Sequence, residues 1–523
     1  MSLPDRNNPY NFDEFLNRRD AFHYLRDDTF LQSAIDQFCG KQANAIKQAV
    51  EAIAERASFR WKKLADEIAS PEKRVYLQHF DAHNRRVDRI VRPADALGFQ
   101  KEIYSEALFS RSTPLWERFV KMFLIYQNGE ANTACPLTCT EGLAELLDVY
   151  ADTPELVAMR DHLQEGIDGG YAVGAQFISE IQGGSDIPEV RVEAVEEGGE
   201  WRLYGKKFFC SVAHADYAVV AAKPRGSESV AIFAVPAWLP GAKGNDKRNG
   251  CTIDRLKWKM GTCELPTAEI TYDGAIAYPI GALDRGLANV VEIVLTYSRV
   301  TIGISSAATM TRAAREARQY AEFRQAFGRS VADFPIAAHQ LDAMQTTAQR
   351  STAGAFKLFG MFQRNLPGKT SSDKHEAFDV RELVMLQKIT SSWDAVDVIR
   401  SAMSMFGGHG IMEDFSSLPR IFRDATVNEL WEGPRNVLLW QIHRDLQKVA
   451  SWYPPKEFVA RNLNGADASI VESMANEMEN LTAHPNLVDN DDATRDVCVQ
   501  WDNFCHRFFQ QWQTQALADI TQL

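Results

Sequence analysis

The spacing of apolar residues divides the chain into three regions. Between about residues 20 and 165, apolar residues recur three and four positions apart, as at Leu31, Ile35 and Phe38, which is typical of helices with one buried face. From about residue 170, short runs rich in Val, Tyr, Phe and Ile alternate with glycine-containing turns, which predicts antiparallel strands in a sheet or small barrel. After Gly286 the helical spacing returns and continues to about residue 450.

This order of elements predicts an α+β multidomain fold. We expect an N-terminal helical domain with an extension, a middle antiparallel β domain, a C-terminal helical domain, and an acidic, helical C-terminal extension, over residues 1–169, 170–285, 286–455 and 456–523. Because strands do not alternate with helices, a doubly wound parallel sheet is disfavoured. The sequence has no G-x-G-x-x-G after a predicted strand and no G-x-x-x-x-G-K-[ST], so it predicts neither a Rossmann dinucleotide site nor a P-loop.

The charge balance argues against nucleic acid and membrane partners. With 57 Lys and Arg against 70 Asp and Glu, the net charge is −13, so phosphate backbones and anionic membranes have no overall attraction for the protein. No charge-free apolar run reaches the roughly 18 residues of a membrane span, and the first residues lack the pattern of a signal peptide. We therefore expect a cytoplasmic protein with no membrane association, and DNA binding is not expected.

The eight cysteines are dispersed along the chain, which favours reduced thiols over a disulfide framework. Cys135 and Cys139 are four residues apart but have no second Cys or His pair at zinc-finger spacing, so no metal site is predicted.

Two segments of the β region combine small, hydroxyl and aromatic residues. In residues 178–186 (ISEIQGGSD), two glycines let the backbone approach a flat ring or a phosphate closely, and Ser179 and Ser185 supply hydroxyls. Strand alternation puts Phe209 and Ser211 on one face, an aromatic plate beside a hydroxyl that suits a flat aromatic cofactor. A hairpin turn and an ordinary core strand would explain the same residues.

Two segments of the C-terminal region carry charged residues at turns. In RQAFGR, Arg324 and Arg329 flank a Phe-Gly turn and could clamp a pyrophosphate, although basic residues at a helix end also favour the helix dipole. In LWEGP, Glu432 lies between a Trp and a Gly-Pro turn. Partly apolar surroundings there would raise its pKa towards the range useful for a general base. A surface glutamate at a helix start is the alternative.

Taken together, these segments resemble the acyl-CoA dehydrogenase family. The strings SEIQGGSD, KKFFCSV, RQAFGR, GGHG and FRDATVNELWEGP occur in the order and at the spacings of that family, over roughly residues 100–450. The resemblance is strongest to the alkylation-response, AidB-type branch, in which QGGSD, a Leu-Lys-x-Lys-x-Gly stretch (here 256–261) and WEG also occur.

The resemblance implies a fold, a cofactor and an assembly. The family has an N-terminal helical domain, a middle β domain and a C-terminal four-helix domain, with FAD between the last two. Residues in contact with the flavin, with Ser185 also reaching the thioester, would be Ile178, Ser179, Gly184, Ser185, Phe209 and Ser211. Residues that bind the rest of FAD, several from a neighbouring subunit, would be Arg324, Phe327, Gly407, Gly408 and Gly433. A homodimer or homotetramer follows from this sharing.

The resemblance also implies a reaction. Glu432 would remove the α proton of an acyl-CoA substrate while the β hydrogen leaves as hydride to flavin N5, and Arg299 would lie near the CoA nucleotide. An electron-transfer flavoprotein or a similar acceptor would reoxidise the flavin. The alternatives are an acyl-CoA oxidase, a nitroalkane-type flavoenzyme, and an AidB-like protective or nucleic-acid-associated flavoprotein, which the acidic charge disfavours.

Three positions depart from the family pattern. Pro434 stands where a threonine usually follows Glu-Gly, so it cannot supply the hydroxyl and N–H that meet FAD. Ser404 stands where a glutamine usually precedes the Gly-Gly pair. Phe209 stands where the family usually has a tryptophan that covers the flavin, and the AidB-type branch has a phenylalanine there too.

Overall fold

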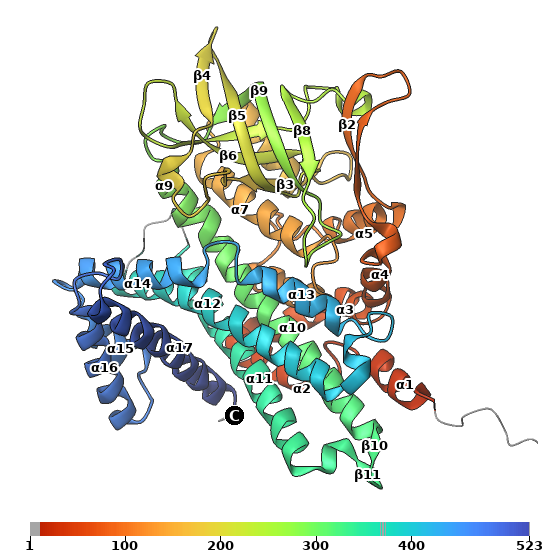
Figure 1. Cartoon of the computed structure of the whole chain (residues 1–523), viewed down its shortest axis with the longest axis vertical. Coiled ribbons are helices and arrows are strands. Elements are labelled where there is room, and N and C mark those ends of the chain that lie inside the picture. Colours follow the sequence, from red (N-terminus) through yellow and green to blue (C-terminus); the bar gives the residue numbers. More distant parts are fainter. Residues whose placement is uncertain (1–10, 367, 369–370, 372, 522–523) are drawn as a thin grey trace, which may run out of the picture.

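The computed structural model describes residues 11–366, 368, 371 and 373–521, and in it a β domain lies at one end of a helical body (Figure 1). Residues 1–10, for which the sequence predicts no targeting segment, lie outside the described residues. The predicted succession of helices, sheet and helices is confirmed.

The N-terminal region is helical with one unpredicted hairpin. Its helices are α1 (Asp13–Ala21), α2 (Thr29–Cys39), α3 (Ala43–Ser58), α4 (Arg60–Ile68), α5 (Ala94–Tyr104), α6 (Leu115–Tyr126), α7 (Ala134–Tyr150) and α8 (Pro154–Gln164). The hairpin pairs β1 (Tyr76–Phe80) with β2 (Arg86–Val91). Asp88 of this hairpin is buried and accepts a hydrogen bond from the backbone N–H of Ile253 at 3.0 Å, which ties the hairpin to the β domain.

The β domain is a seven-stranded sheet that closes on itself. Its strands are β3 (Gly174–Phe177), β4 (Glu193–Glu197), β5 (Glu200–Ser211), β6 (Tyr217–Pro224), β7 (Ala231–Pro236), β8 (Cys251–Leu256) and β9 (Thr267–Pro279). They follow the order β3-β6-β4-β5-β9-β7, with β8 on β9 and β7 returning to β6. This agrees with the small barrel that the alternation of strands and turns predicts.

The prediction of a purely antiparallel sheet is wrong for two pairings. Both β3 and β4 pair with β6 in parallel. They lie at successive positions along β6, β3 beside residues 217–220 and β4 beside residues 223–224, so the chain continues in one direction after leaving the sheet between residues 178 and 192. Hydrophobic alternation predicts that a strand exists but not the direction of its neighbour, and this excursion carries the predicted glycine-serine segment.

The C-terminal helices form a bundle around one long buried helix. They are α9 (Gly286–Asn289), a π-helical turn (Val290–Val294), α10 (Leu295–Phe323), α11 (Pro335–Arg364), α12 (Lys374–Met405), α13 (Leu418–Asn428) and α14 (Arg435–Val449). The segment 286–323 is long and apolar enough to cross a membrane, but 72% of its most apolar window is buried inside the protein, as in the core helix of a bundle. A short hairpin follows the C-terminal end of α10. It pairs β10 (Gln325–Ala326) with β11 (Arg329–Ser330).

The C-terminal extension forms the helices α15 (Pro455–Asn462), α16 (Ala468–Thr482) and α17 (Asp492–Thr521). Although the segment is acidic, α17 buries an aromatic stripe that packs on the bundle: Trp501, Phe504, Phe508, Phe509 and Trp512. The extension therefore belongs to the core of the C-terminal region.

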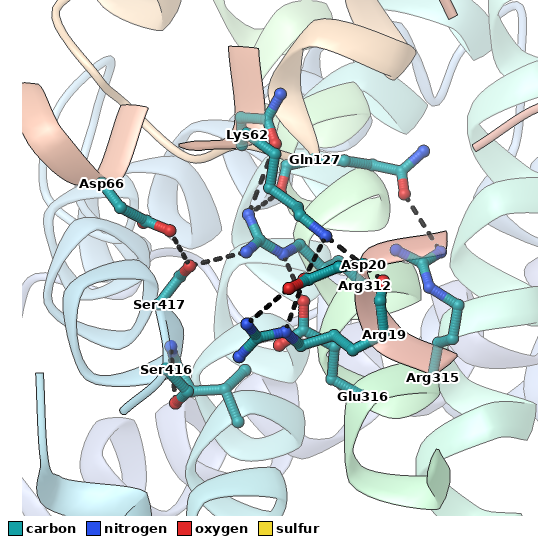
Figure 2. Close-up of polar contacts among 12 residues, drawn as sticks. Arg19, Asp20, Lys62, Asp66, Gln127, Arg312, Arg315, Glu316, Ser416 and Ser417 are labelled. Carbon is teal, nitrogen blue, oxygen red and sulfur yellow. Dashed lines mark hydrogen bonds and ion pairs between the residues drawn. The ribbon is translucent and has the colours of Figure 1, made fainter. Parts of the chain in front are cut away.

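A buried polar network joins the N-terminal and C-terminal helices (Figure 2). The guanidinium of Arg312 on α10 donates to Glu316 at 2.7 Å and to the hydroxyl of Ser417 at 2.6 Å. Ser417 in turn donates to Asp66 on α4 at 2.7 Å, and Arg420 on α13 donates to the same carboxylate at 2.8 Å. Because Ser417 and Arg420 both bond to Asp66, these contacts hold the start of α13 against α4, and the end of α13 leads directly to Glu432.

Candidate functional site

Glu432 lies in a strained turn between α13 and α14. Its φ is 61°, and that of Gly433 is 103°. A left-handed backbone is rare for glutamate, and such strain is concentrated at functional sites. A Cβ on Gly433 would come within 2.9 Å of the Leu438 side chain, so this position requires glycine. The rigid bend expected from the Trp-Glu-Gly-Pro sequence is thus present.

Two buried cations, Arg299 and Lys388, hydrogen-bond to backbone carbonyl groups of this turn. Arg299 on α10 donates from Nε to the carbonyl oxygen of Glu432 at 3.0 Å. Lys388 on α12 donates from Nζ to the carbonyl oxygens of Glu429 and Gly433 at 2.9 and 2.7 Å. Arg299 therefore positions the turn. Its predicted contact with a CoA nucleotide stays a prediction.

The sequence analysis missed Lys388. The signal that could have found it is a single lysine inside the apolar stretch LVMLQKIT of a predicted helix. A fully buried lysine is rare unless it is paired.

The pKa values of Glu432, Lys388 and Arg299 depend on burial and on one another's charges. Burial raises the pKa of Glu432 to about 7, although the nearby charges of Arg299 and Lys388 oppose that rise. Burial lowers the pKa of Lys388 to about 7 and that of Arg299 to about 10, and the carboxylate of Glu432 opposes both shifts. A carboxyl group with this pKa can accept and release a proton near neutrality.

Glu432 lines a cleft of about 580 Å³ between α7, α10 and α13. The same cleft is lined by Trp431, by Ile302 and Ser305 of α10, and by Tyr126 at the end of α6. This volume includes space that is open to solvent. Glu432 thus lies at a cleft between the helices of the N-terminal and C-terminal regions.

The loop at residues 178–186 is held by a buried ion pair that the sequence analysis did not identify. Lys207 donates to Glu180 Oε1 at 2.7 Å and to the carbonyl oxygen of Ile178 at 3.0 Å, and both charged side chains are almost wholly buried. Glu180 also accepts the backbone N–H of Arg191 at 2.7 Å. These contacts fix the first residues of the loop against β5 and against the backbone at Arg191.

The predicted cofactor residues of this loop take distinct positions. Ile178 packs against the core and Ser179 is half-buried, whereas Ser185 is exposed. A Cβ on Gly184 would collide with the hydroxyl oxygen of Ser179, so glycine is required there. Above Gly183 the space is open, which leaves the backbone accessible to a ligand.

The neighbouring strand offers an exposed aromatic ring. Phe209 on β5 is 54% exposed, and Ser211 lies two residues further on the same strand with its hydroxyl 3.2 Å from that of Thr267. β5 runs through Gly205 as one continuous strand, although a glycine often marks a turn. The backbone N–H of Phe208 donates to the carbonyl oxygen of Ser179 at 3.0 Å, so the strand with this uncovered ring adjoins the glycine-serine loop. An exposed phenyl ring on a strand next to an accessible glycine backbone suits the flat ring of a flavin, so these residues are suited to hold FAD.

Of the other predicted cofactor residues, Gly433 lies in the Glu432 turn, and the rest gather at the opposite end of the bundle. Phe327 is 97% exposed at the tip of the β10–β11 hairpin, which follows Arg324. Gly407 and Gly408 are also exposed, and His409 beside them lies 3.1 Å from the hydroxyl of Tyr320 at the end of α10. Figure 1 shows this hairpin at the end of the helical body remote from the β domain. Within one chain, these residues therefore lie far from β5, the strand that carries Phe209.

One carboxylate joins all three domains beside the cleft. Asp424 on α13 accepts the backbone N–H groups of Thr262 at 2.7 Å and Glu130 at 3.3 Å. All three residues line the cleft, and none was a candidate from the sequence. Across the described part of the chain, no group of three or more His, Cys, Asp or Glu side chains is arranged to hold a metal ion.

Comparison with known proteins agrees with this architecture. Residues 175–275 match the acyl-CoA dehydrogenase middle domain and residues 284–447 match the acyl-CoA dehydrogenase C-terminal domain. The chain is 28% identical to Caenorhabditis elegans acyl-CoA dehydrogenase family member 11 over 462 residues, 84% of this chain and 71% of that protein. It is 27% identical to the putative acyl-CoA dehydrogenase AidB of Escherichia coli over 454 residues, 82% of this chain and 79% of that protein.

A solved structure shows the same fold. Caenorhabditis elegans ACDH-11, determined in complex with C11-CoA, superposes with a TM-score of 0.80 at 22% identity, over 95% of this chain and 89% of that one. The two matched domains together cover just over half of the sequence. The chain therefore belongs to the acyl-CoA dehydrogenase family, whose members are oxidoreductases with FAD as cofactor.

Proposed function

We propose that the protein dehydrogenates the α,β bond of an acyl-CoA thioester, with Glu432 as the base that removes the α proton. The observation that carries this proposal is the partly buried carboxyl group of Glu432 in the 580 Å³ cleft, with a pKa raised to about 7. The C11-CoA in the structure of the related ACDH-11 supports an acyl-CoA as the substrate class.

The residues of the site have complementary tasks in this reaction. The carboxylate of Glu432 takes the α proton, and the hydrogen bond from Arg299 to its carbonyl oxygen keeps the turn in place. Lys388 holds the other side of the turn, and its charge favours the ionised carboxylate. The cleft is lined mainly by buried residues, and low-dielectric surroundings strengthen electrostatic stabilisation of the charge that develops on the thioester. The chemistry that FAD supplies when bound is acceptance of the β hydrogen as hydride.

The same proposal includes the partners. A reduced flavin has to be reoxidised, and we propose an electron-transfer flavoprotein or a similar acceptor. We also propose a homodimer or homotetramer, because the residues suited to the flavin ring and those at the β10–β11 hairpin lie at opposite ends of one chain. A cytoplasmic location is part of the proposal.

An anaerobic flavin-bleaching screen tests the function. The FAD-loaded protein is mixed with short, long, branched and aromatic acyl-CoAs, and loss of the flavin absorbance is followed. We expect bleaching with at least one class. Failure with every acyl-CoA would contradict the proposal, and rapid oxygen uptake after bleaching would indicate an oxidase instead.

The variant Glu432→Gln tests the assigned base. We expect bleaching about 10²–10⁴-fold slower, because a general base contributes rate factors of that size. Exchange of the α hydrogen with deuterated water, followed by NMR, should be lost in parallel. The matched control is Glu292→Gln, an exposed glutamate outside the cleft, which should bleach like the wild type. Equal exchange in Glu432→Gln and the wild type would assign the base elsewhere.

A further inference from the structure

The strand β5 carries a bulge at the aromatic ring that suits the flavin. The register of β5 against β9 shifts between Lys207 and Cys210. In this interval two residues of β5, Phe208 and Phe209, lie opposite the single residue Glu269 of β9. Such a β-bulge adds a residue to one strand and re-aims its side chains, and bulges are frequent next to active sites. The bulge therefore sets the direction of the exposed Phe209 ring.

Lys257, directly after β8, lies over both rings of this bulge. Its Nζ is 3.0 Å from the centre of the Phe208 ring and 4.8 Å from that of the Phe209 ring. The two rings meet edge to face, with centroids 5.0 Å apart. In a regular strand, neighbouring side chains point to opposite faces of the sheet, so the bulge is what brings both rings to one cation.

The ammonium group of Lys257 is itself held in place. It donates to the carboxylate of Glu269, the residue opposite the bulge, and the Lys257 side chain is only 9% exposed. Arg255 on β8 donates to the same carboxylate at 2.6 Å. Two cations thus share one carboxylate, so one positive charge remains to interact with the rings. A cation over an aromatic face attracts the ring, most strongly where water is excluded.

We propose that Lys257 is a positioning residue for FAD, which holds the Phe208–Phe209 bulge so that the Phe209 ring lies against the flavin. The inference rests on the flavin lying at Phe209, as in the proposed function, and not on the acyl-CoA reaction. A side chain already held in its bound conformation loses less entropy when the ligand binds. Lys257 therefore raises the affinity for FAD through the ring that it holds.

Release of FAD from the loaded protein tests the proposal without any acyl-CoA. The protein is diluted, and the fraction of free FAD, measured by flavin fluorescence, gives its Kd. In Lys257→Met we expect a Kd about threefold to tenfold above that of the wild type, because cation–π contacts have that size. Glu269 keeps Arg255 as a partner in this variant, so the fold should persist, which circular dichroism checks.

A second neutral variant covers the case in which Lys257→Met does not fold. Lys257→Gln has no charge but can still donate a hydrogen bond to Glu269, so it should fold and show the same weakening of FAD binding. A wild-type Kd in a folded neutral variant would overturn the inference.

Two variants separate this role from a general effect of charge. Arg255→Met removes the other cation bound to Glu269 and leaves Lys257 over the rings. The Arg255 side chain is 63% exposed, so the Kd for FAD should stay within about twofold of the wild type. Lys257→Arg restores a cation that can stack on a ring, so it should recover most of the affinity. Equal weakening in Arg255→Met and Lys257→Met, or no rescue by Lys257→Arg, would overturn the inference.

A double variant tests whether Lys257 acts through the ring. Phe209→Leu keeps an apolar side chain at this exposed position but removes the aromatic face, so it should itself weaken FAD binding. Adding Lys257→Met to Phe209→Leu should then weaken binding no further, because the effects of residues that act through one contact do not add. Additive losses would overturn the inference and leave the proposed dehydrogenation intact, whereas failure of every acyl-CoA to bleach the flavin would contradict only the dehydrogenation.

Discussion

The ionisation of Glu432 is set by burial on one side and by two cations on the other. Burial raises its pKa to about 7, and the charges of Arg299 and Lys388 limit that rise. Because only the ionised carboxylate can take the α proton, the rate of flavin reduction should increase with pH and level off above about 7. Stopped-flow bleaching at a fixed, saturating acyl-CoA concentration across pH 5.5 to 8.5 measures this. A rate that is constant across that range would contradict the assignment.

Replacing Arg299 by Met should shift this profile. The variant loses a positive charge that favours the ionised carboxylate, so the pKa of Glu432 should rise, and the midpoint of the profile should move upward by about one pH unit. It also loses the hydrogen bond to the carbonyl oxygen of Glu432, so the plateau rate should fall.

The conservative variant Arg299→Lys separates charge from geometry. It keeps the charge and should keep the midpoint near that of the wild type, although the plateau falls because a lysine does not reproduce the guanidinium contact. A midpoint that does not move in Arg299→Met would show that Arg299 acts on the turn without influencing the proton.

At the scale of elements, the loop at residues 178–186 depends on the buried pair of Glu180 and Lys207. Replacing Lys207 by Met leaves a buried carboxylate without its cation, which costs about 3–5 kcal/mol of unfolding free energy. The loop should loosen at the same time, so the purified variant should retain less FAD. Urea unfolding and the ratio of flavin to protein absorbance measure the two effects.

Lys206, next to Lys207 in the sequence, provides the control for the Lys207→Met variant. Lys206 lies on the same strand with its side chain 73% exposed, and its pairing with Asp254 at 3.3 Å is a surface contact. Lys206→Met should change stability by less than about 1 kcal/mol and leave FAD content unchanged. Similar losses in the two variants would show that the loop does not depend on the buried pair.

The sequence predicted the helices and strands better than it predicted which of them pair or pack together. Helical periodicity identified α10, and alternation identified β6 and β7, because a buried stripe leaves a repeating pattern. It missed the β1–β2 hairpin, whose residues are mostly exposed or half-exposed and which is held by distant contacts such as Asp88 with Ile253. Parallel pairing of β3 and β4 with β6 arises from long-range contacts that leave no local signal.

In the candidate site, too, the sequence predicted the local features but not the long-range contacts. Glu432 and its turn follow from a short local string, so the sequence could place them. Lys388, Asp424 and Glu130 act through contacts with residues far away in the chain, so only the folded structure reveals them. Motifs report residues that touch a ligand, whereas the residues that position them are found from packing.

At the scale of the whole molecule, the C-terminal extension is a structural part of the bundle. Trp512 on α17 is 1% exposed and stacks on Phe509 with ring centroids 5.4 Å apart. Replacing Trp512 by Ala should lower the unfolding free energy by about 3–5 kcal/mol, because a large buried ring is lost and a cavity remains. Val499→Ala on the same helix, where the side chain is 63% exposed, should have almost no effect in the same urea titration. Equal stability of the two variants would mean that the extension is dispensable.

The separation of the two groups of cofactor residues makes a prediction about assembly. Phe327 is 97% exposed at the far end of the bundle, so Phe327→Asp should not disturb the fold of its own chain. If the hairpin completes the cofactor site of a neighbouring chain, homo-oligomers of this variant should retain little FAD and bleach poorly. Val499→Asp, an equally drastic change at an exposed position on α17, should retain FAD normally.

Mixed oligomers decide whether the hairpin acts across chains. A Glu432→Gln chain keeps an intact hairpin, and a Phe327→Asp chain keeps an intact base, so a site in a mixed dimer can draw both intact parts from different chains. Co-expression with two affinity tags in equal amounts should recover about a quarter of wild-type activity, since half of the dimers are mixed and one of their two sites is complete. Each variant alone should remain inactive. Absence of recovery in purified mixed dimers would mean that the hairpin serves its own chain or no cofactor.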